Sequence, residues 1–246
     1  PERERGYLQM AAQRWVDGVL FVTTTDTMHG LDALEAAGIP FLAIDRIPDG
    51  YDGPWVILDN RKTGTIVGEH LLDLGHRRLA HISGPLDLRL SRERLGSFAA
   101  AIRARGLEPL PHDSGDSTWS CASGYQAMRR LLAAETRPTA VFAANDRLAI
   151  GATRAAVEAG LRVPKDISIA GVDDIESAAY QSPPLTTVRQ SLQEVATLGT
   201  KILLDLLRGE KDVETRIEFE PELVIRESTA APPIHAQEEP KEVHPA

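Results

Sequence analysis

The chain has 246 residues, 42% of them hydrophobic, and a formal net charge of −9. This length and composition allow one large globular core or two smaller ones, and they exclude a fibrous or wholly disordered chain. The negative charge argues against a general affinity for nucleic-acid phosphates, which requires clustered Lys and Arg.

No apolar run approaches the roughly 20 residues of a membrane span, and the sequence from Pro1 to Arg5 does not resemble a signal peptide. We therefore expect a cytoplasmic protein with no membrane partner. The single cysteine, Cys121, excludes an internal disulfide framework and a multi-cysteine metal site. It is interpreted as a small, partly buried side chain.

Short apolar runs rich in β-branched residues predict buried parallel strands, and a helix is predicted before the first of them. In chain order the predicted strands are 19–22, 41–44, 79–82, 140–143 and 167–170. Between them, apolar residues at helical spacing predict amphipathic helices around 95–102, 125–132 and 195–206.

Glycines follow four of the helical segments, as expected where a helix closes in the left-handed conformation. They are Gly38, Gly75, Gly106 and Gly160. Helices that alternate with buried strands indicate a doubly wound α/β fold, which binds ligands beyond the carboxyl ends of its strands. Alternating residues near 217–225 predict a final half-exposed strand, and the Pro- and Glu-rich tail from Ala230 is predicted to be disordered.

Several segments, in their order and spacing, resemble the lactose-repressor (LacI) family of bacterial transcriptional regulators, and together they cover nearly the whole chain. They are Asp59-Asn60, the run from Gly75 to Pro85, Arg94-Leu95-Gly96-Ser97-Phe98, the run from Pro138 to Asp146, the run from Val163 to Asp174 and the run from Pro183 to Gln190.

The resemblance implies an α/β fold with two lobes, like that of periplasmic binding proteins, in which doubly wound parallel sheets are joined by three crossover strands. The crossings are expected near 58–61, 189–191 and 211–215. The N-terminal lobe would comprise 1–59 and 191–212, the C-terminal effector-binding lobe 60–190 and 213–228, and the disordered tail 229–246.

The resemblance also implies a homodimer that binds a small polar effector, either a sugar or a nucleoside-like molecule. Effector binding would close the two lobes and so control the binding of operator DNA by a helix-turn-helix headpiece. That headpiece and the first strands of the N-terminal lobe are expected to be missing, so that this lobe is truncated. Because a missing central strand leaves backbone groups unpaired, we expect the N-terminal lobe to be poorly stable. Strong hydrogen-exchange protection throughout 19–45 would contradict this.

Three polar residues fall on family positions that contact the effector. Arg94 supplies fixed guanidinium donors to hydroxyls or a carboxylate, with a solvated helix arginine as the alternative. Asn145 can donate and accept toward a sugar hydroxyl. Asp173 can accept hydrogen bonds from two adjacent hydroxyls. The next residue after Asn145, Asp146, is interpreted as the N-cap of the following helix rather than as a ligand residue.

Trp119 falls on a family position that stacks on the ligand, although core packing remains an alternative. Gln190, Asp59 and Asp45 are weaker candidates near crossings or strand ends, where surface or turn roles are equally compatible with the sequence. These residue types suit a sugar, a nucleoside or a purine, and do not name the effector.

Enzyme functions rank low, because the chain contains no phosphate-cradling glycine motif and no G-x-S-x-G elbow. The spacings of His70, His76 and His81 do not predict a zinc site, and Asp173 and Asp174 need not converge as acid and base. No catalytic residue, metal or cofactor is therefore predicted. The alternatives are a hydrolase on the same fold and, closer, a periplasmic sugar-binding protein of a transport system. The segment from Gly75 to Arg78 favours a regulator.

Overall fold

The computed structural model describes residues 2–23, 26 and 30–233, which form two compact units. Among these residues, unit 1 contains those up to Asp59, together with Asp87–Leu90 and Ser191–Pro221. Unit 2 contains Asn60–Leu86, Ser91–Gln190 and those from Glu222 onward. No helix in the described ranges is both long and apolar enough to cross a bilayer.

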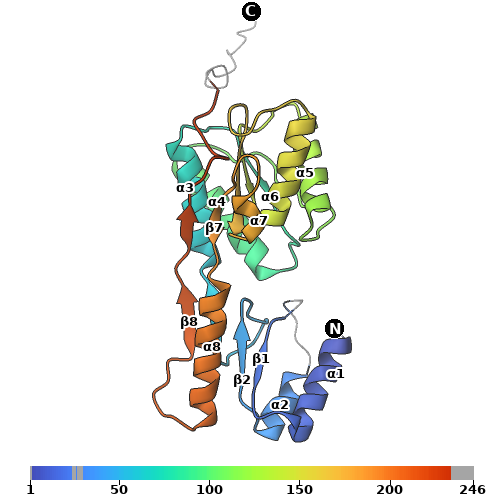
Figure 1. Cartoon of the computed structure of the whole chain (residues 1–246), viewed down its shortest axis with the longest axis vertical. Helices are drawn as coiled ribbons and strands as arrows, with labels where there is room; N and C mark the ends of the chain where they lie inside the picture. Colours follow the sequence, from blue (N-terminus) through green and yellow to red (C-terminus); the bar gives the residue numbers. More distant parts are fainter. Residues whose placement is uncertain (1, 24–25, 27–29, 234–246) are drawn as a thin grey trace, which may run out of the picture. The chain divides into compact units, whose positions relative to one another are not determined.

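Unit 1 is built on a parallel sheet with the strand order β1-β2-β3-β8. Successive strand residues pack on opposite faces, as Phe41 and Leu42 of β2 do. One face packs against α8 and the other against α1 and α2, and β1 is an outer strand of the sheet (Figure 1). The elements are α1 (Glu2–Met10), the short π-helical segment Ala11–Trp15, β1 (Val19–Phe21), α2 (Leu31–Ala37), β2 (Phe41–Ile44), β3 (Trp55–Leu58), α8 (Leu192–Leu207) and β8 (Arg216–Phe219).

Unit 2 has a five-stranded sheet with the order β4-β5-β6-β7-β9, in which only β9 is antiparallel to its neighbour. Alternate residues of β5 divide between two cores: Val141 packs with α5 and α6, whereas Phe142 packs with α3 and α4. The strands are β4 (Leu79–Ile82), β5 (Ala140–Ala143), β6 (Ser168–Asp173), β7 (Thr186–Arg189) and β9 (Glu222–Val224). The helices are α3 (Asn60–Asp73), α4 (Arg89–Ala104), α5 (Cys121–Ala133), α6 (Asp146–Glu158) and α7 (Glu176–Ala179).

Helices α5 and α6 approach each other through two glycines. A Cβ added at Gly124 would lie 2.0 Å from the carbonyl oxygen of Leu148, and one added at Gly151 would lie 1.9 Å from that of Cys121. Since real Cβ atoms do not approach backbone so closely, the absence of a side chain at both positions is what allows this contact.

The predicted α/β class and all five predicted strands are confirmed. Three strands have the predicted bounds, and the ends of β1 and β6 differ by one to three residues. The four glycines predicted to end helices have φ angles between 68° and 96°. Two further strands, β3 and β7, are not among the predicted runs.

The lobe boundary expected between residues 212 and 213 is wrong. The strand 216–219 pairs with β3 in register from Trp55 opposite Arg216 to Leu58 opposite Phe219, so it belongs to the sheet of unit 1. The chain returns to unit 2 only after Pro221. The alternating segment near 217–225 therefore forms two strands in different sheets. Residues 87–90, which include the first two residues of α4, also group with unit 1. Within unit 1, the backbone N–H of Arg89 donates to the carboxylate of Asp26.

The tail predicted to be disordered from 229 is ordered as far as Pro233. The carbonyl oxygen of Ala230 accepts hydrogen bonds from Nε2 of His76, at 2.9 Å, and from the hydroxyl of Ser168, at 3.0 Å. Thr229 lies 3.0 Å from Nε2 of His70. These bonds hold the segment against unit 2 as an extended strap, while residues 234–246 lie outside the described residues.

Candidate functional site

Apart from Trp119, which lies in the irregular segment before α5, the candidate residues of unit 2 lie at the carboxyl ends of its four parallel strands or on the helices that follow them. Ser83 and Gly84 follow β4, Asn145 follows β5 closely, and Asp173 ends β6. Gln190 comes directly after β7. Because β4 to β7 run parallel, these ends share one edge of the sheet, where doubly wound folds bind ligands.

Arg94 is buried, with only 4% of its surface exposed, on the first half of α4. Its Nε donates to Oδ1 of Asn60 at 2.8 Å, and its Nη1 donates to the carbonyl oxygen of Ala144 at 2.6 Å. The alternative interpretation of Arg94 as a solvated arginine on a helix is therefore wrong. The guanidinium is fixed beside the strand end that carries Asn145, and Asn60, its partner, was not foreseen as part of the site.

Asn145, and not Asp146, is the N-cap of α6. Its Oδ1 accepts the backbone N–H of Leu148 at 2.9 Å, and its backbone is extended, as a cap requires. The sequence interpretation placed the cap one residue too late. Because the cap engages the amide oxygen, the two amide N–H groups are what Asn145 can offer to a ligand.

Asp146 is fully buried in the first turn of α6. Its Oδ1 accepts the hydroxyl of Thr187 at 2.6 Å, and its Oδ2 accepts the backbone N–H of Ile175 at 2.9 Å. Burial, assisted by the nearby negative charges of Asp173 and Asp174, raises the pKa of Asp146 to about 7, against the lowering effect of its two hydrogen bonds.

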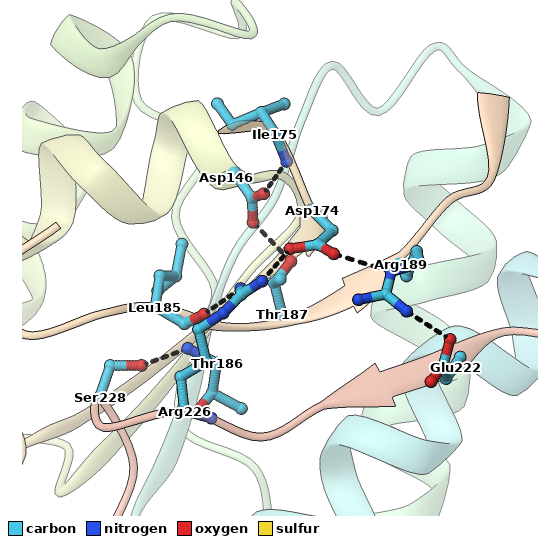
Figure 2. A network of polar contacts seen from close by, with 10 residues as sticks. All are labelled: Asp146, Asp174, Ile175, Leu185, Thr186, Thr187, Arg189, Glu222, Arg226 and Ser228. Carbon is cyan, nitrogen blue, oxygen red and sulfur yellow. Dashed lines mark hydrogen bonds and ion pairs between the residues drawn. The ribbon is translucent and has the colours of Figure 1, made fainter. Parts of the chain in front are cut away.

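Asp173 and Asp174 both have positive φ angles, 116° and 55°, which is uncommon for residues with a side chain. The backbone N–H of Gln190 lies 3.5 Å from the carbonyl oxygen of Asp173. Asp174 lies outside the strand and pairs with two arginines: Nε of Arg189 donates to its Oδ2 at 2.8 Å, and Nη2 of Arg226 donates to its Oδ1 (Figure 2). Burial alone would raise the pKa of Asp174, but these two partners outweigh it and hold that pKa below its usual value.

Trp119 is partly buried and packs against the core on the α5–α6 side of the sheet. A Cβ added at Gly84 would lie 2.2 Å from its ring, so the indole rests directly on the backbone that follows β4. Core packing is thus one role of Trp119, next to the carboxyl ends of the strands. Gln190 is buried, with 7% of its surface exposed.

The two remaining candidates belong to unit 1. Asp45 follows β2 with a φ of 68° and lies 3.4 Å from the guanidinium of Arg46. The backbone N–H of Asp59 donates to the carbonyl oxygen of Phe219 at 2.9 Å and so extends the pairing of β3 with β8. Both side chains are partly exposed.

Three buried polar side chains near β4 were not predicted from the sequence. The ring of His81 lies between Phe98 and Phe142, at centroid distances of 5.7 and 4.6 Å, and burial lowers its pKa to about 3. Neither its ring nitrogens nor the hydroxyls of Ser83 and Ser91 have a hydrogen-bond partner within the described part of the chain. His81 is therefore a neutral ring in an apolar environment, and across the described ranges no group of three His, Cys, Asp or Glu could hold a metal ion.

Comparison with known proteins identifies the family. The family model of the periplasmic binding protein-like domain matches residues 68–229. The HTH-type transcriptional repressor PurR of Klebsiella pneumoniae (strain 342) is 36% identical over 236 residues, which are 95% of this chain and 69% of that protein. Nothing in these comparisons favours a transport protein.

Solved structures agree. A LacI family transcriptional regulator from Enterococcus faecium with bound ribose superposes with a TM-score of 0.82 at 29% identity, covering 93% of this chain and 85% of that one. A lac repressor dimer bound to operator and the anti-inducer ONPF superposes with a TM-score of 0.82 at 31% identity, covering 92% and 78%. The chain therefore belongs to the LacI family of transcriptional regulators, in which it forms an effector-sensing domain.

Proposed function

We propose that the carboxyl edge of the unit 2 sheet binds a small hydroxyl-rich effector, a sugar or a nucleoside. Binding then changes the operator affinity of a homodimeric regulator in the cytoplasm through a DNA-binding headpiece. The proposal is supported by the placement of Asn145, Asp173 and Gln190 at the carboxyl ends of neighbouring parallel strands. The guanidinium of Arg94, on α4, donates to the carbonyl oxygen of Ala144, the residue before Asn145.

The chemistry of these groups suits adjacent hydroxyls. A carboxylate such as that of Asp173 can accept from two hydroxyls at once, while the amide N–H groups of Asn145 and the guanidinium of Arg94 donate. The indole of Trp119 could cover the apolar C–H face of a sugar ring. The relative from Enterococcus faecium holds ribose, which is a ligand of this chemical class.

The proposal is tested by titration of the purified chain with ribose and with inosine. Binding is measured by isothermal titration calorimetry and by the shift in melting temperature. A ligand of the native state raises the melting temperature by mass action. We expect saturable binding of at least one probe, and at least 10-fold weaker binding by Asp173→Ala, which corresponds to about 1.4 kcal/mol or more.

Asp166→Ala is the matched control, because Asp166 forms an ion pair with Arg162 on the surface of the same unit. This variant should bind as the unsubstituted chain does. Full binding by Asp173→Ala would contradict the assigned role, and absence of binding for sugars and nucleosides alike would contradict the ligand class.

The chain itself should not bind operator DNA, since its net charge of −9 disfavours a general affinity for nucleic-acid phosphates. An electrophoretic mobility assay and a size-exclusion measurement of mass would test the DNA and dimer parts of the proposal separately.

A further inference from the structure

The segment that carries Asp173 has a backbone that its own sequence does not favour. Asp173 and Asp174 are consecutive non-glycine residues with positive φ, at 116° and 55°. Such conformations persist only where surrounding contacts hold them. The contacts that hold this segment therefore determine where the Asp173 carboxylate lies.

One anchor is the carboxylate of Asp174. Arg189 donates from Nε to Oδ2 at 2.8 Å, and Arg226 donates from Nη2 to Oδ1. The side chains of Asp174 and Arg226 are only 11% and 18% exposed. Arg226 is itself fixed by a bond from Nη1 to the carbonyl oxygen of Leu185 at 2.8 Å (Figure 2). This arrangement is more rigid than a solvent-exposed ion pair, and loss of one member leaves poorly solvated charges unpaired.

The second anchor is Asp146, which accepts the backbone N–H of Ile175 at 2.9 Å and the hydroxyl of Thr187 at 2.6 Å. Asp173 is thus followed in the chain by two anchored residues: the side chain of Asp174 is bound by arginines, and the backbone of Ile175 is bound by α6. The same helix begins next to Asn145, another candidate ligand residue.

Arg189, the partner of Asp174 on β7, extends the network to two of the chain segments that connect the units. Arg189 pairs with Glu222 in the β7–β9 register, and its Nη1 donates to Oε2 of Glu222 at 2.9 Å. Gln190, the neighbour of Arg189, is the last residue of unit 2 before Ser191, and Glu222 is the first after Pro221. Arg189 and Glu222 therefore lie at two passages of the chain between the units.

We propose that Asp174 is a positioning residue of the effector site: its ion pairs with Arg189 and Arg226 fix the backbone that presents Asp173 and link it to the two connecting strands, β7 and β9. This inference rests on the proposed function for the role of Asp173. Effector binding at Asp173 and the conformation of the connecting strands β7 and β9 are then coupled through the carboxylate of Asp174.

The test compares Asp174→Asn, which removes the charge at constant size, with Asp174→Glu, whose longer carboxylate can still pair with both arginines. Asp166→Asn is the matched control, since it breaks an exposed aspartate–arginine pair of the same unit. Hydrogen exchange is measured at amides 173–176 and 222–224, and ribose and inosine affinities are measured at 25 °C.

We expect at least 10-fold faster exchange at both segments and at least 10-fold weaker probe binding in Asp174→Asn. Substantial recovery is expected in Asp174→Glu, and no change in Asp166→Asn. Unchanged exchange at both segments, or faster exchange with unchanged probe affinity, would overturn the proposal. The second result would leave Asp174 with a purely structural role.

Failure of the proposed function would look different. If the unsubstituted chain binds neither ribose nor inosine, the ligand class is refuted, and the exchange data decide on Asp174 alone. Acceleration confined to the two segments then supports only the part of the proposal in which Asp174 fixes the backbone, whereas its absence refutes that part as well. If Asp174→Asn does not fold, Arg189→Gln, which removes one of the two ion pairs of Asp174, is compared with the unsubstituted chain by the same measurements.

Discussion

Replacement of Asp146 by Asn should change how the stability of unit 2 depends on pH. The carboxyl group is fully buried, and its pKa is raised to about 7 from the ordinary aspartate value of 3.8. A carboxyl group with a raised folded-state pKa binds more protons in the folded than in the unfolded state between these two values. Its contribution to stability is therefore complete below about pH 4 and is lost as the pH rises to about 7.

The magnitude follows from the same two values. A shift of one pKa unit corresponds to about 1.4 kcal/mol, so the full shift corresponds to about 4 kcal/mol. Between pH 5 and pH 8, the linkage relation gives a loss on the order of 3 kcal/mol in the free energy of unfolding from Asp146 alone. Asn carries no proton to lose. It can accept the Ile175 N–H and donate to the Thr187 oxygen, so Asp146→Asn should lack this loss.

The assay is urea unfolding at pH 5, 6, 7 and 8, in a background where Trp15 and Trp55 are Phe. Trp119 then reports on unit 2 as the remaining tryptophan of the three in the chain. Asp166→Asn is the control, because the Arg162 hydrogen bonds lower the pKa of Asp166 to about 2, below the whole pH range of the assay. Parallel pH profiles for Asp146→Asn and the unsubstituted chain would refute the reasoning.

Two further substitutions test the packing of unit 2. Gly151→Ala places a Cβ 1.9 Å from the carbonyl oxygen of Cys121 and should lower the free energy of unfolding by about 3 kcal/mol. Gly96→Ala is the control, because this helical glycine has open space around it; the substitution should be neutral or stabilising by up to about 1 kcal/mol. Equal effects in urea unfolding would contradict the assigned contact. His81→Phe keeps a ring between Phe98 and Phe142 and removes two unpartnered nitrogens, so it should raise the melting temperature, with a gain of about 1 kcal/mol. A lower melting temperature would show that the imidazole is hydrogen-bonded in solution.

The sequence predicts much of the fold because its signals are local. A run such as 140–143 is apolar on both sides because helices cover both faces of the sheet, and this holds wherever the strand lies in it. Strand pairing is different. The segment 216–219 pairs with β3, which is more than about 150 residues earlier in the sequence. Because this pairing is long-range, the alternating pattern of the segment does not predict which sheet contains it.

The site divides in the same way. The candidates Asn145 and Asp173 could be found because each follows a recognisable strand and falls on a family motif. The cap was misplaced by one residue because Asn and Asp are both good N-caps, and the sequence does not fix the first helical residue to that precision. The partners of Asp174 are 15 and 52 residues away, so only the folded chain shows that this carboxylate is anchored.

The order of strands in unit 1 has a consequence for synthesis on the ribosome. Its sheet is completed by β8, which is made only after nearly all of unit 2 has been translated. Until then β3 lacks a neighbour on one side, and its backbone groups there are open to other chains. Unit 2 in turn waits for β9 and the strap that follows it. A ribosome that pauses before residue 216 would hold two incomplete sheets at once, in which β3 and β7 each lack a strand that pairs with them in the finished fold.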